Sequence, residues 1–217
     1  MGGVGGTGRR ANRRSHMTKS TPRERLLDAA TDLFCRLGFH AVGVDAIVGR
    51  AGTAKTTLYK LFGSKEALVE AVLEQEGRAW REWFIGALDT GEATARQRLD
   101  RIVPLLRDWF GQERFFGCPF INAVAEHDKG DDRMRRLALG HKVVVLDRIE
   151  TLLREAGAPD PTGLSHQLGL IIDGAIVAAL VTRKPEIGDA AGNAFSCLLD
   201  AQTNRLPDVQ GEKRAAA

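Results

Sequence analysis

The sequence has few cysteines and no long hydrophobic run. Its 217 residues include only Cys35, Cys118 and Cys197, which are too few and too scattered for a disulfide framework or a zinc site. The longest nearly apolar stretch, 168–181, contains Asp173 and is shorter than the roughly 20 residues that span a membrane. No apolar segment lies near the beginning, so no secretory signal is expected. These absences favour a reduced, cytoplasmic protein with no membrane contact.

Motifs of common enzyme classes are also lacking. There is no GxSxG, HExxH, Walker-type phosphate loop or CxxC, and the glycines of 2–8 match a phosphate loop in composition only. His127, His141 and His166 could meet Glu126 at a metal, but without ligand spacing partly buried structural histidines are favoured. We therefore expect no enzyme activity, no metal and no cofactor.

Charge is distributed unevenly along the chain. Hydrophobic residues make up 43% and charged residues 27%, which is ordinary for a globular protein. The net charge is +3, but residues 1–66 contain 12 Lys and Arg against 5 Asp and Glu, whereas the remainder contains 19 against 23. A basic first third on an acidic remainder indicates that one end contacts a polyanion.

Helix signals run along the whole chain, without strand-like alternation. Thr21-Pro22-Arg23-Glu24 forms a capping box, an apolar face follows, and Gly38 ends the first helix. Two short helices, 44–50 and 54–62, are joined by a turn containing Gly52, and Ser64 caps a long helix. Further helices are expected at 94–112 (kinked by Pro104), 119–127, 131–156, 162–183 and 188–203. The prediction is an all-α fold of about nine helices.

Four regions follow from this pattern. Residues 1–20 are either a disordered basic arm that tracks phosphates or a non-native extension, with Met17 as the true start. Residues 21–66 form a helix-turn-helix domain, 67–205 a helical ligand-binding and dimerisation domain, and 206–217 a frayed tail.

The second short helix has a polar face suited to DNA. Hydroxyl groups and lysines next to a helix N-terminus supply the donors and positive charge that phosphates and base edges need. Leu58, Leu61 and Phe62 are expected to pack on the opposite face. The candidate DNA-binding residues are Thr53, Lys55, Thr56, Thr57, Tyr59, Lys60 and Lys65.

The segment from Arg25 to Leu73 resembles the DNA-binding domain of the TetR family of transcriptional regulators. The resemblance rests on Leu37-Gly38-Phe39, Asp45-Ala46-Ile47, Ala51-Gly52-Thr53, Thr57-Leu58-Tyr59 with Phe62, and Ser64-Lys65-Glu66-Ala67-Leu68. Gly117-Cys118-Pro119-Phe120-Ile121-Asn122 is similar to a segment of some members. The resemblance implies that Lys55, Thr56 and Thr57 reach base edges or phosphates and that Tyr59 and Lys65 contact the backbone. Gly43, Thr56 and Leu61 depart from the family pattern, which has Thr, Gly and an aromatic residue or His there.

Aromatic residues are only 6% of the chain, yet most lie between 80 and 120. Such a cluster either fills the core or lines an apolar cavity. The candidate ligand-binding residues are Trp80, Trp83, Phe84, Trp109, Phe116 and Phe120. Cys118, before Pro119 at a helix start, is either an oxidant-sensing thiolate or a small buried apolar residue.

The last two helices predict an interface. Residues 167–181 are apolar nearly all round and rich in Gly and Ala, so this helix must be covered on every side, and a second copy of the chain would complete the cover. The candidate interface residues are Ile171, Gly174, Ala175, Ala178, Phe195 and Leu198.

Together these features favour a homodimeric repressor that binds double-stranded operator DNA and a small lipophilic or aromatic effector. The alternatives are a constitutive or oxidant-sensing regulator that uses Cys118, and an all-α ligand-binding protein or enzyme with a vestigial DNA-binding domain.

Overall fold

The computed structural model describes residues 20–128, 130 and 132–203, and all regular secondary structure in that part is helical. This confirms the predicted all-α class. The proposed basic arm, apart from Ser20, and the proposed tail lie outside the described residues. The helices are α1 (Pro22–Leu37), α2 (Val44–Ala51), α3 (Lys55–Phe62), α4 (Lys65–Asp89), α5 (Ala95–Asp100), α6 (Ile102–Phe110), α7 (Pro119–Glu126), α8 (Asp132–Glu155), α9 (Pro161–Thr182) and α10 (Ile187–Thr203).

One local cap and two contacts between helices build the N-terminal unit of α1, α2 and α3. The capping box at Thr21 is present: its hydroxyl accepts from the Glu24 N–H at 3.2 Å, and the Glu24 carboxylate accepts from the Thr21 N–H at 2.7 Å. The Arg25 Nε donates to the Ala51 carbonyl at 3.1 Å and so ties α1 to the end of α2. Leu26, Ile47 and Leu58, fully buried, join the three helices in one core.

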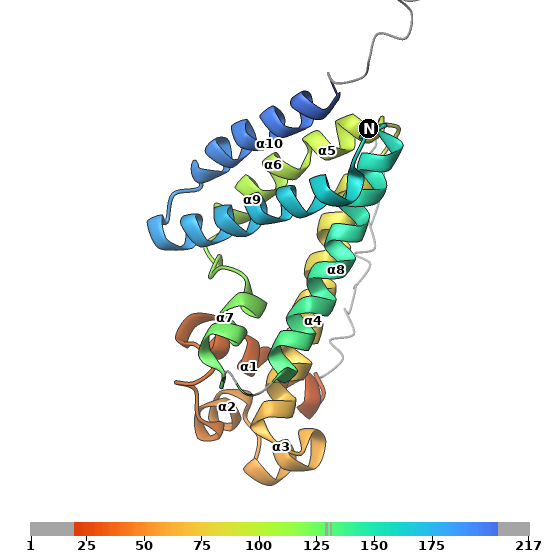
Figure 1. The fold of residues 1–217 in the computed structure, drawn as a ribbon. Coiled ribbons are helices and arrows are strands. Elements are labelled where there is room, and N and C mark those ends of the chain that lie inside the picture. Colours follow the sequence, from red (N-terminus) through yellow and green to blue (C-terminus); the bar gives the residue numbers. More distant parts are fainter. Residues whose placement is uncertain (1–19, 129, 131, 204–217) are drawn as a thin grey trace, which may run out of the picture.

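Two long helices run from this unit through the molecule (Figure 1). α4 and α8 pack side by side, and α9 and α10 lie across the end remote from α1–α3. α4 begins directly after the helix-turn-helix, with Ser64 as its N-cap, and continues without a break to Asp89. The predicted domain boundary at 66/67 therefore falls inside the first turn of one continuous helix.

The helix expected over 94–112 is two helices, α5 and α6, separated at Arg101. Pro104 explains the separation. It has no N–H to donate to the carbonyl of Asp100, four residues earlier, and its ring crowds that carbonyl. In the observed arrangement Pro104 occupies the first turn of α6, where N–H groups have no partner within the helix.

α9 is the helix whose sequence stands out as apolar. By length and composition it is the one described helix that could cross a membrane, because its 22 residues are apolar as well as numerous enough, and the apolar run 168–181 is only part of it. It packs between α8 and α10, and 39% of its most apolar window is buried within the chain. A helix that packs in a protein core and also has one exposed apolar face can be as long and as apolar as a membrane-spanning helix.

Candidate functional site

The α2–α3 turn has the geometry of a helix-turn-helix. Gly52 ends α2 in the left-handed conformation (φ 59°, ψ 45°), and the next N–H, of Thr53, donates to the Val48 carbonyl at 3.0 Å. α3 begins at Lys55, and its N-cap residue Ala54 offers no side-chain acceptor to the first N–H groups. α2 is uncapped as well, because Gly43 provides no side-chain oxygen where the TetR pattern has Thr.

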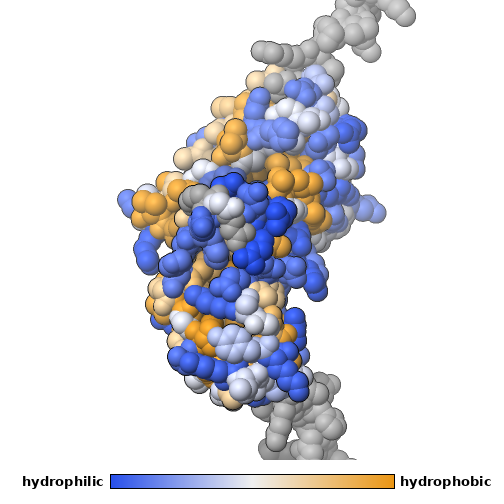
Figure 2. Space-filling model, turned by 60° about the horizontal axis from the view of Figure 1, so that its bottom comes forward, coloured by the Kyte–Doolittle hydropathy of each residue, from blue (hydrophilic) through white to orange (hydrophobic). Residues whose placement is uncertain are grey.

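Most of the predicted DNA-binding residues lie on the outer surface of this unit. Lys55, Thr56, Tyr59 and Lys60 are exposed, and Thr57 and Lys65 are half-buried. Seen from this end, the surface is mostly hydrophilic, with hydrophobic atoms gathered towards its sides (Figure 2).

Two residues of this segment are not placed as expected. The Thr53 hydroxyl is buried, because the left-handed turn at Gly52 folds this residue back against α2, so it does not face outward in this structure. Leu61 was predicted to pack with Leu58 and Phe62 but is 41% exposed. Leu58 and Phe62 are one helical turn apart, whereas Leu61 is rotated by about 60° from Leu58 and falls on the side of Thr57.

Lys55 is held by a neighbour on the other helix. Its Nζ lies 2.8 Å from Asp45 Oδ1, and this contact raises the pKa of Lys55. Both side chains are more than half exposed, so the pair contributes little to stability. An incoming phosphate would compete with Asp45 for this ammonium group.

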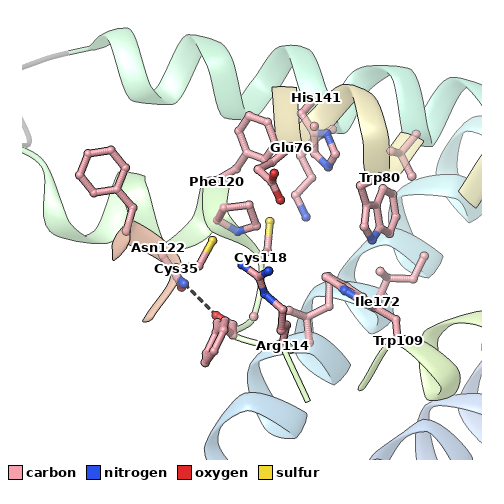
Figure 3. Close-up of a pocket in the computed structure, with 18 of the residues that line it drawn as sticks. Cys35, Glu76, Trp80, Trp109, Arg114, Cys118, Phe120, Asn122, His141 and Ile172 are labelled. Atoms are coloured by element: carbon pink, nitrogen blue, oxygen red, sulfur yellow. Dashed lines mark hydrogen bonds between the residues drawn. The ribbon is translucent and has the colours of Figure 1, made fainter. Parts of the chain in front are cut away.

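An internal cavity of about 120 Å³ lies between α1, α4, α7, α8 and α9 (Figure 3). Gly77 on α4 permits the close approach of α7 that bounds it, since a Cβ there would lie 2.6 Å from the Phe120 ring. The Asn122 amide donates to the Phe116 carbonyl at 3.0 Å and holds the segment before α7. The lining residues are Phe34, Cys35, Phe39, Glu76, Gly77, Trp80, Trp109, Arg114, Phe116, Gly117, Cys118, Pro119, Phe120, Asn122, His141, Lys142, Val145, Ile172 and Ile176.

Four of the six aromatic residues predicted to bind a ligand lie in the wall of the cavity. Trp80, Trp109, Phe116 and Phe120 line the cavity. Phe84 does not: it lies one turn beyond Trp80, stacked on it at 4.6 Å, and is fully buried in the core. Trp83 does not either, because it is rotated away from Trp80 and is 37% exposed.

The polar groups in the cavity have contrasting environments. Burial raises the pKa of Glu76, Arg114 opposes this shift, and Asp28 adds to it. Burial, with Arg81 and Lys142 nearby, lowers the pKa of His141 to about 4, so its imidazole is neutral at pH 7. This ring stacks on Phe120 at 4.2 Å, and its Nδ1 contacts Arg81 at 3.0 Å. Among the described residues the buried Trp80 Nε1 has no hydrogen-bond partner.

The two cavity cysteines are poorly suited to redox chemistry. Cys118 is 5% exposed, and burial raises the pKa of its thiol. Burial also raises the pKa of Cys35 to about 11. Because the thiolate is the reactive form, both environments disfavour reaction of the thiol. No group of three or more His, Cys, Asp or Glu in the described part of the chain could hold a metal, and His166 is exposed.

α7 links the cavity to the DNA-binding unit. It begins in the cavity wall with Pro119 and Phe120 and ends at Glu126. The Glu126 carboxylate accepts from the backbone N–H of His40 at 3.0 Å, in the loop between α1 and α2. The His127 ring lies 6.0 Å from that of Phe39, which itself lines the cavity.

The predicted interface residues have different exposures. Ala175 and Phe195 are 5% and 2% exposed because they pack into the core of their own chain, so a partner cannot contact them in this structure. Ile171, Ala178 and Leu198 are half-buried, and Gly174 is exposed. The outward stripe of α9 instead contains Leu170, Gly174, Val177 and Val181, of which Leu170 and Val181 are 74% and 77% exposed.

Comparison with known proteins assigns the family. A model described as bacterial regulatory proteins of the tetR family matches residues 26–72. The chain is 30% identical to a TetR-family transcriptional regulator from Streptomyces coelicolor, covering 84% of this chain and 96% of that one, with a TM-score of 0.78. The chain belongs to the TetR family of transcriptional regulators. It is therefore a DNA-binding regulator rather than an enzyme.

Other relatives match this chain over a shorter segment or share its fold at lower sequence identity. The HTH-type transcriptional activator FasR of Mycolicibacterium smegmatis is 43% identical over 70 residues, which are 32% of this chain and 31% of the activator. The regulatory protein TetR from Rhodobacter sphaeroides shares the fold, with 23% identity, a TM-score of 0.72 and coverage of 81% of this chain and 97% of that one. Similarity to the curated activator thus covers less than a third of its length.

The sequence did not indicate the polar residues of the cavity. Glu76, Arg114 and Lys142 belong to different helices or loops, and each reads as an ordinary surface charge in an amphipathic pattern. Asn122 does belong to a recognisable motif, because it is the last residue of the segment 117–122, which is similar to a segment of some TetR-family members. No local pattern indicates that these four residues meet.

Proposed function

We propose that the chain is a homodimeric, cytoplasmic repressor that a small lipophilic or aromatic molecule releases from operator DNA. The observation that carries this proposal is the position of the cavity. Its wall includes Phe34 and Phe39 of the DNA-binding unit, Trp80 of α4 and the beginning of α7. A molecule in the cavity therefore touches the elements that hold α3.

DNA binding is assigned to α3 and its surroundings. The proposed contacts are Lys55, Thr56, Thr57, Tyr59, Lys60 and Lys65. In a two-fold dimer the two copies of α3 would enter successive major grooves about one helical turn apart. The exposed stripe of α9 around Val177 supports pairing through this helix, since an apolar face on a soluble regulator needs a partner.

Release requires that the effector prefer a state in which the two recognition helices no longer fit the operator. α4 is one packed helix from Ser64 to the cavity, so a shift at Trp80 moves its N-terminal end as well. A coupling of about 1–3 kcal/mol would lower operator affinity roughly 5–150-fold. Operator DNA must then weaken effector binding by the same factor.

The alternative of an oxidant sensor at Cys118 has less support. Its thiol is buried and un-ionised, whereas sensor thiols are accessible and have a lowered pKa. A thiol-blocking reagent should therefore leave Cys118 unmodified at neutral pH, and in a Cys197→Ser variant, which lacks the exposed cysteine, it should leave operator affinity unchanged.

A promoter-binding screen with purified protein tests the proposal. The protein should bind selected promoter fragments, and Lys55→Ala and Tyr59→Phe should each weaken binding with little change in melting temperature. Loss of the Lys55 phosphate contact should also reduce the slope of log affinity against log salt by about one. The matched control is Lys184→Ala, exposed in the connection between α9 and α10. Unchanged binding in both test variants, or activation of the bound promoters in a reporter assay, contradicts the proposal.

A further inference from the structure

The internal cavity shares part of its wall with a groove on the outside of the molecule. This groove lies between α1, α4 and residues 111–118, the non-helical segment that joins α6 to α7. Each shared residue is exposed or half-buried, so a single layer of side chains separates the cavity from solvent here. The residues that line both the cavity and the groove are Cys35, Glu76, Trp109, Arg114 and Phe116.

An ion pair ties the segment 111–118 to α1 at this wall. Arg114 Nη2 lies 3.2 Å from Asp32 Oδ1, and the Arg114 side chain is 67% exposed, whereas that of Asp32 is 18% exposed. The Asp32 carboxylate also pairs with Arg50 of α2 at 2.6 Å and, more loosely, with Arg36 of α1 at 3.9 Å. If Arg114 moves away, two other cations remain beside this carboxylate. The contact can therefore break without leaving a half-buried charge unpaired.

The segment 111–118 is the part of the cavity wall that can open at the least cost. It consists of turns and irregular backbone, whereas the rest of the wall lies mainly on helices. Segments with few regular backbone hydrogen bonds open locally at a lower free energy than packed helices. Gly111 and Gly117, near its two ends, tolerate the changes in backbone angles that a hinge requires.

The cavity also borders a second groove, between α8 and α9, through Lys142, Val145 and Ile172. Both sides of that groove are long continuous helices, and widening it would separate side chains packed along their length. Leu170 in the second groove belongs to the exposed stripe of α9 that is proposed to pair with a second chain. Opening at the segment 111–118 requires neither change.

We propose that the cavity exchanges with solvent through the groove between α1 and α4, and that the ion pair between Arg114 and Asp32 holds this entrance closed. When Arg114 leaves Asp32, the segment 111–118 can move outward and uncover the cavity. Because Asp32 also holds Arg50, the entrance and the contact between α1 and α2 share one carboxylate. The inference rests on the proposed function only in taking the cavity as the effector site.

The rate at which Cys118 is alkylated measures opening, because this cysteine lines the cavity and is only 5% exposed. The starting protein is the Cys197→Ser variant, which lacks the exposed cysteine. The probe is iodoacetamide, a small uncharged reagent, at pH 9, where an exposed thiol is largely ionised. Peptide mass spectrometry separates the product at Cys118 from that at Cys35. When opening and closing are faster than alkylation, the initial rate is proportional to the open population.

Arg114→Met should raise the initial rate at Cys118 about two- to fivefold, the range expected for loss of a partly exposed ion pair. Arg114→Lys keeps the charge and should stay closer to the wild type. The matched control is Arg36→Met, which removes another partner of Asp32 but leaves the segment 111–118 attached, and should react at the wild-type rate. Melting curves by circular dichroism show whether each variant is folded. Amide exchange should rise in the segment and not in α8 or α9, which separates local opening from global unfolding.

The direct effect of charge on the thiol does not imitate this result. Removing a nearby cation raises the pKa of a thiol and slows alkylation, so a faster rate in Arg114→Met reports opening. Lys142→Met tests the second groove in the same way, since Lys142 lowers the pKa of Cys118. An unchanged rate in Arg114→Met, or a faster rate in Lys142→Met than in Arg114→Met, overturns the inference.

Failure of this inference is distinct from failure of the proposed function, because the experiment contains neither effector nor DNA. If alkylation is unchanged in Arg114→Met but a small molecule still releases the operator, inducible repression stands and the entrance lies elsewhere. If Arg114→Met opens the cavity and no cavity ligand changes operator affinity, the entrance stands and inducible repression fails.

Discussion

The ion pair between Lys55 and Asp45 lies on the surface proposed to meet DNA. Its two members have opposite effects there: the ammonium attracts phosphate, while the carboxylate repels it and competes for the ammonium. Inside the molecule, single residues act through burial instead. His141 stays neutral for two reasons. Its charged imidazolium form would lose its hydrating water on burial, and it would also lie near the positive charges of Arg81 and Lys142.

Asp45→Asn should tighten operator binding up to about fivefold, because it frees Lys55 and removes a negative charge near the phosphates. Fluorescence anisotropy with operator DNA at two salt concentrations measures the effect. Asp147→Asn, exposed on α8 and far from α3, is the control. Equal or weaker binding by the Asp45 variant would show that this carboxylate does not compete with DNA.

His141 should make the protein sensitive to mild acid. In the unfolded chain its pKa returns to the ordinary value of 6.5, so between pH 6.5 and about 4 the unfolded state binds more protons than the folded state. Stability therefore falls as the pH falls through this window, by about 2 kcal/mol at pH 5 from this group alone. His141→Gln should lose less stability between pH 7.5 and 5 in urea titrations, whereas the exposed His166→Gln should follow the wild type.

At the scale of elements, α7 and α4 connect the cavity with the DNA-binding unit in different ways. α4 is continuous with that unit, so it transmits a shift as one packed helix. α7 is only eight residues long and reaches the α1–α2 loop through the Glu126 carboxylate. Gly38 makes this contact possible, since a Cβ there would lie 2.9 Å from a Glu126 oxygen and the backbone has φ +88°.

Glu126→Ala should loosen this second connection. We expect faster amide exchange at His40 and a loss of about 1 kcal/mol of stability, since a hydrogen bond to a charged acceptor is removed. Glu126→Gln retains a carbonyl acceptor and should restore most of the protection. Hydrogen-exchange mass spectrometry of the α1–α2 loop measures both. Unaltered exchange in the alanine variant would mean that the loop is held by other contacts.

At the scale of the whole molecule, α9 and α10 close the end remote from DNA, and the exposed stripe of α9 is unpaired in one chain. Leu170, Gly174, Val177 and Val181 recur at the spacing of one helical face. Pairing of two chains through this face would fix the distance between their recognition helices, and assembly and DNA binding would then depend on the same surface.

Gly174→Arg and Val177→Glu should each give a folded monomer that no longer binds operator, because each places an unpaired charge in the interface but an exposed charge in the monomer. Sedimentation velocity measures the association state, and circular dichroism the fold. Leu61→Glu, exposed at the opposite end, should remain dimeric. A dimer in both α9 variants would assign the interface to another surface.

Local signals in the sequence determined the helices and the turn at Gly52, because caps, glycine conformation and apolar periodicity act between residues a few positions apart. The family resemblance of the same segment predicted that α3 contacts DNA. Local signals also indicated the break near Pro104, although as a kink rather than two helices. Tertiary structure alone decided which side chains face the cavity. Trp80 and Trp83 are alike in sequence, but only Trp80 lines it, because α7 and α8 pack on one side of α4. The same packing buries Ala175 and Phe195 within the chain and brings Glu76 together with aromatic residues from other helices, and such long-range contacts leave no local pattern.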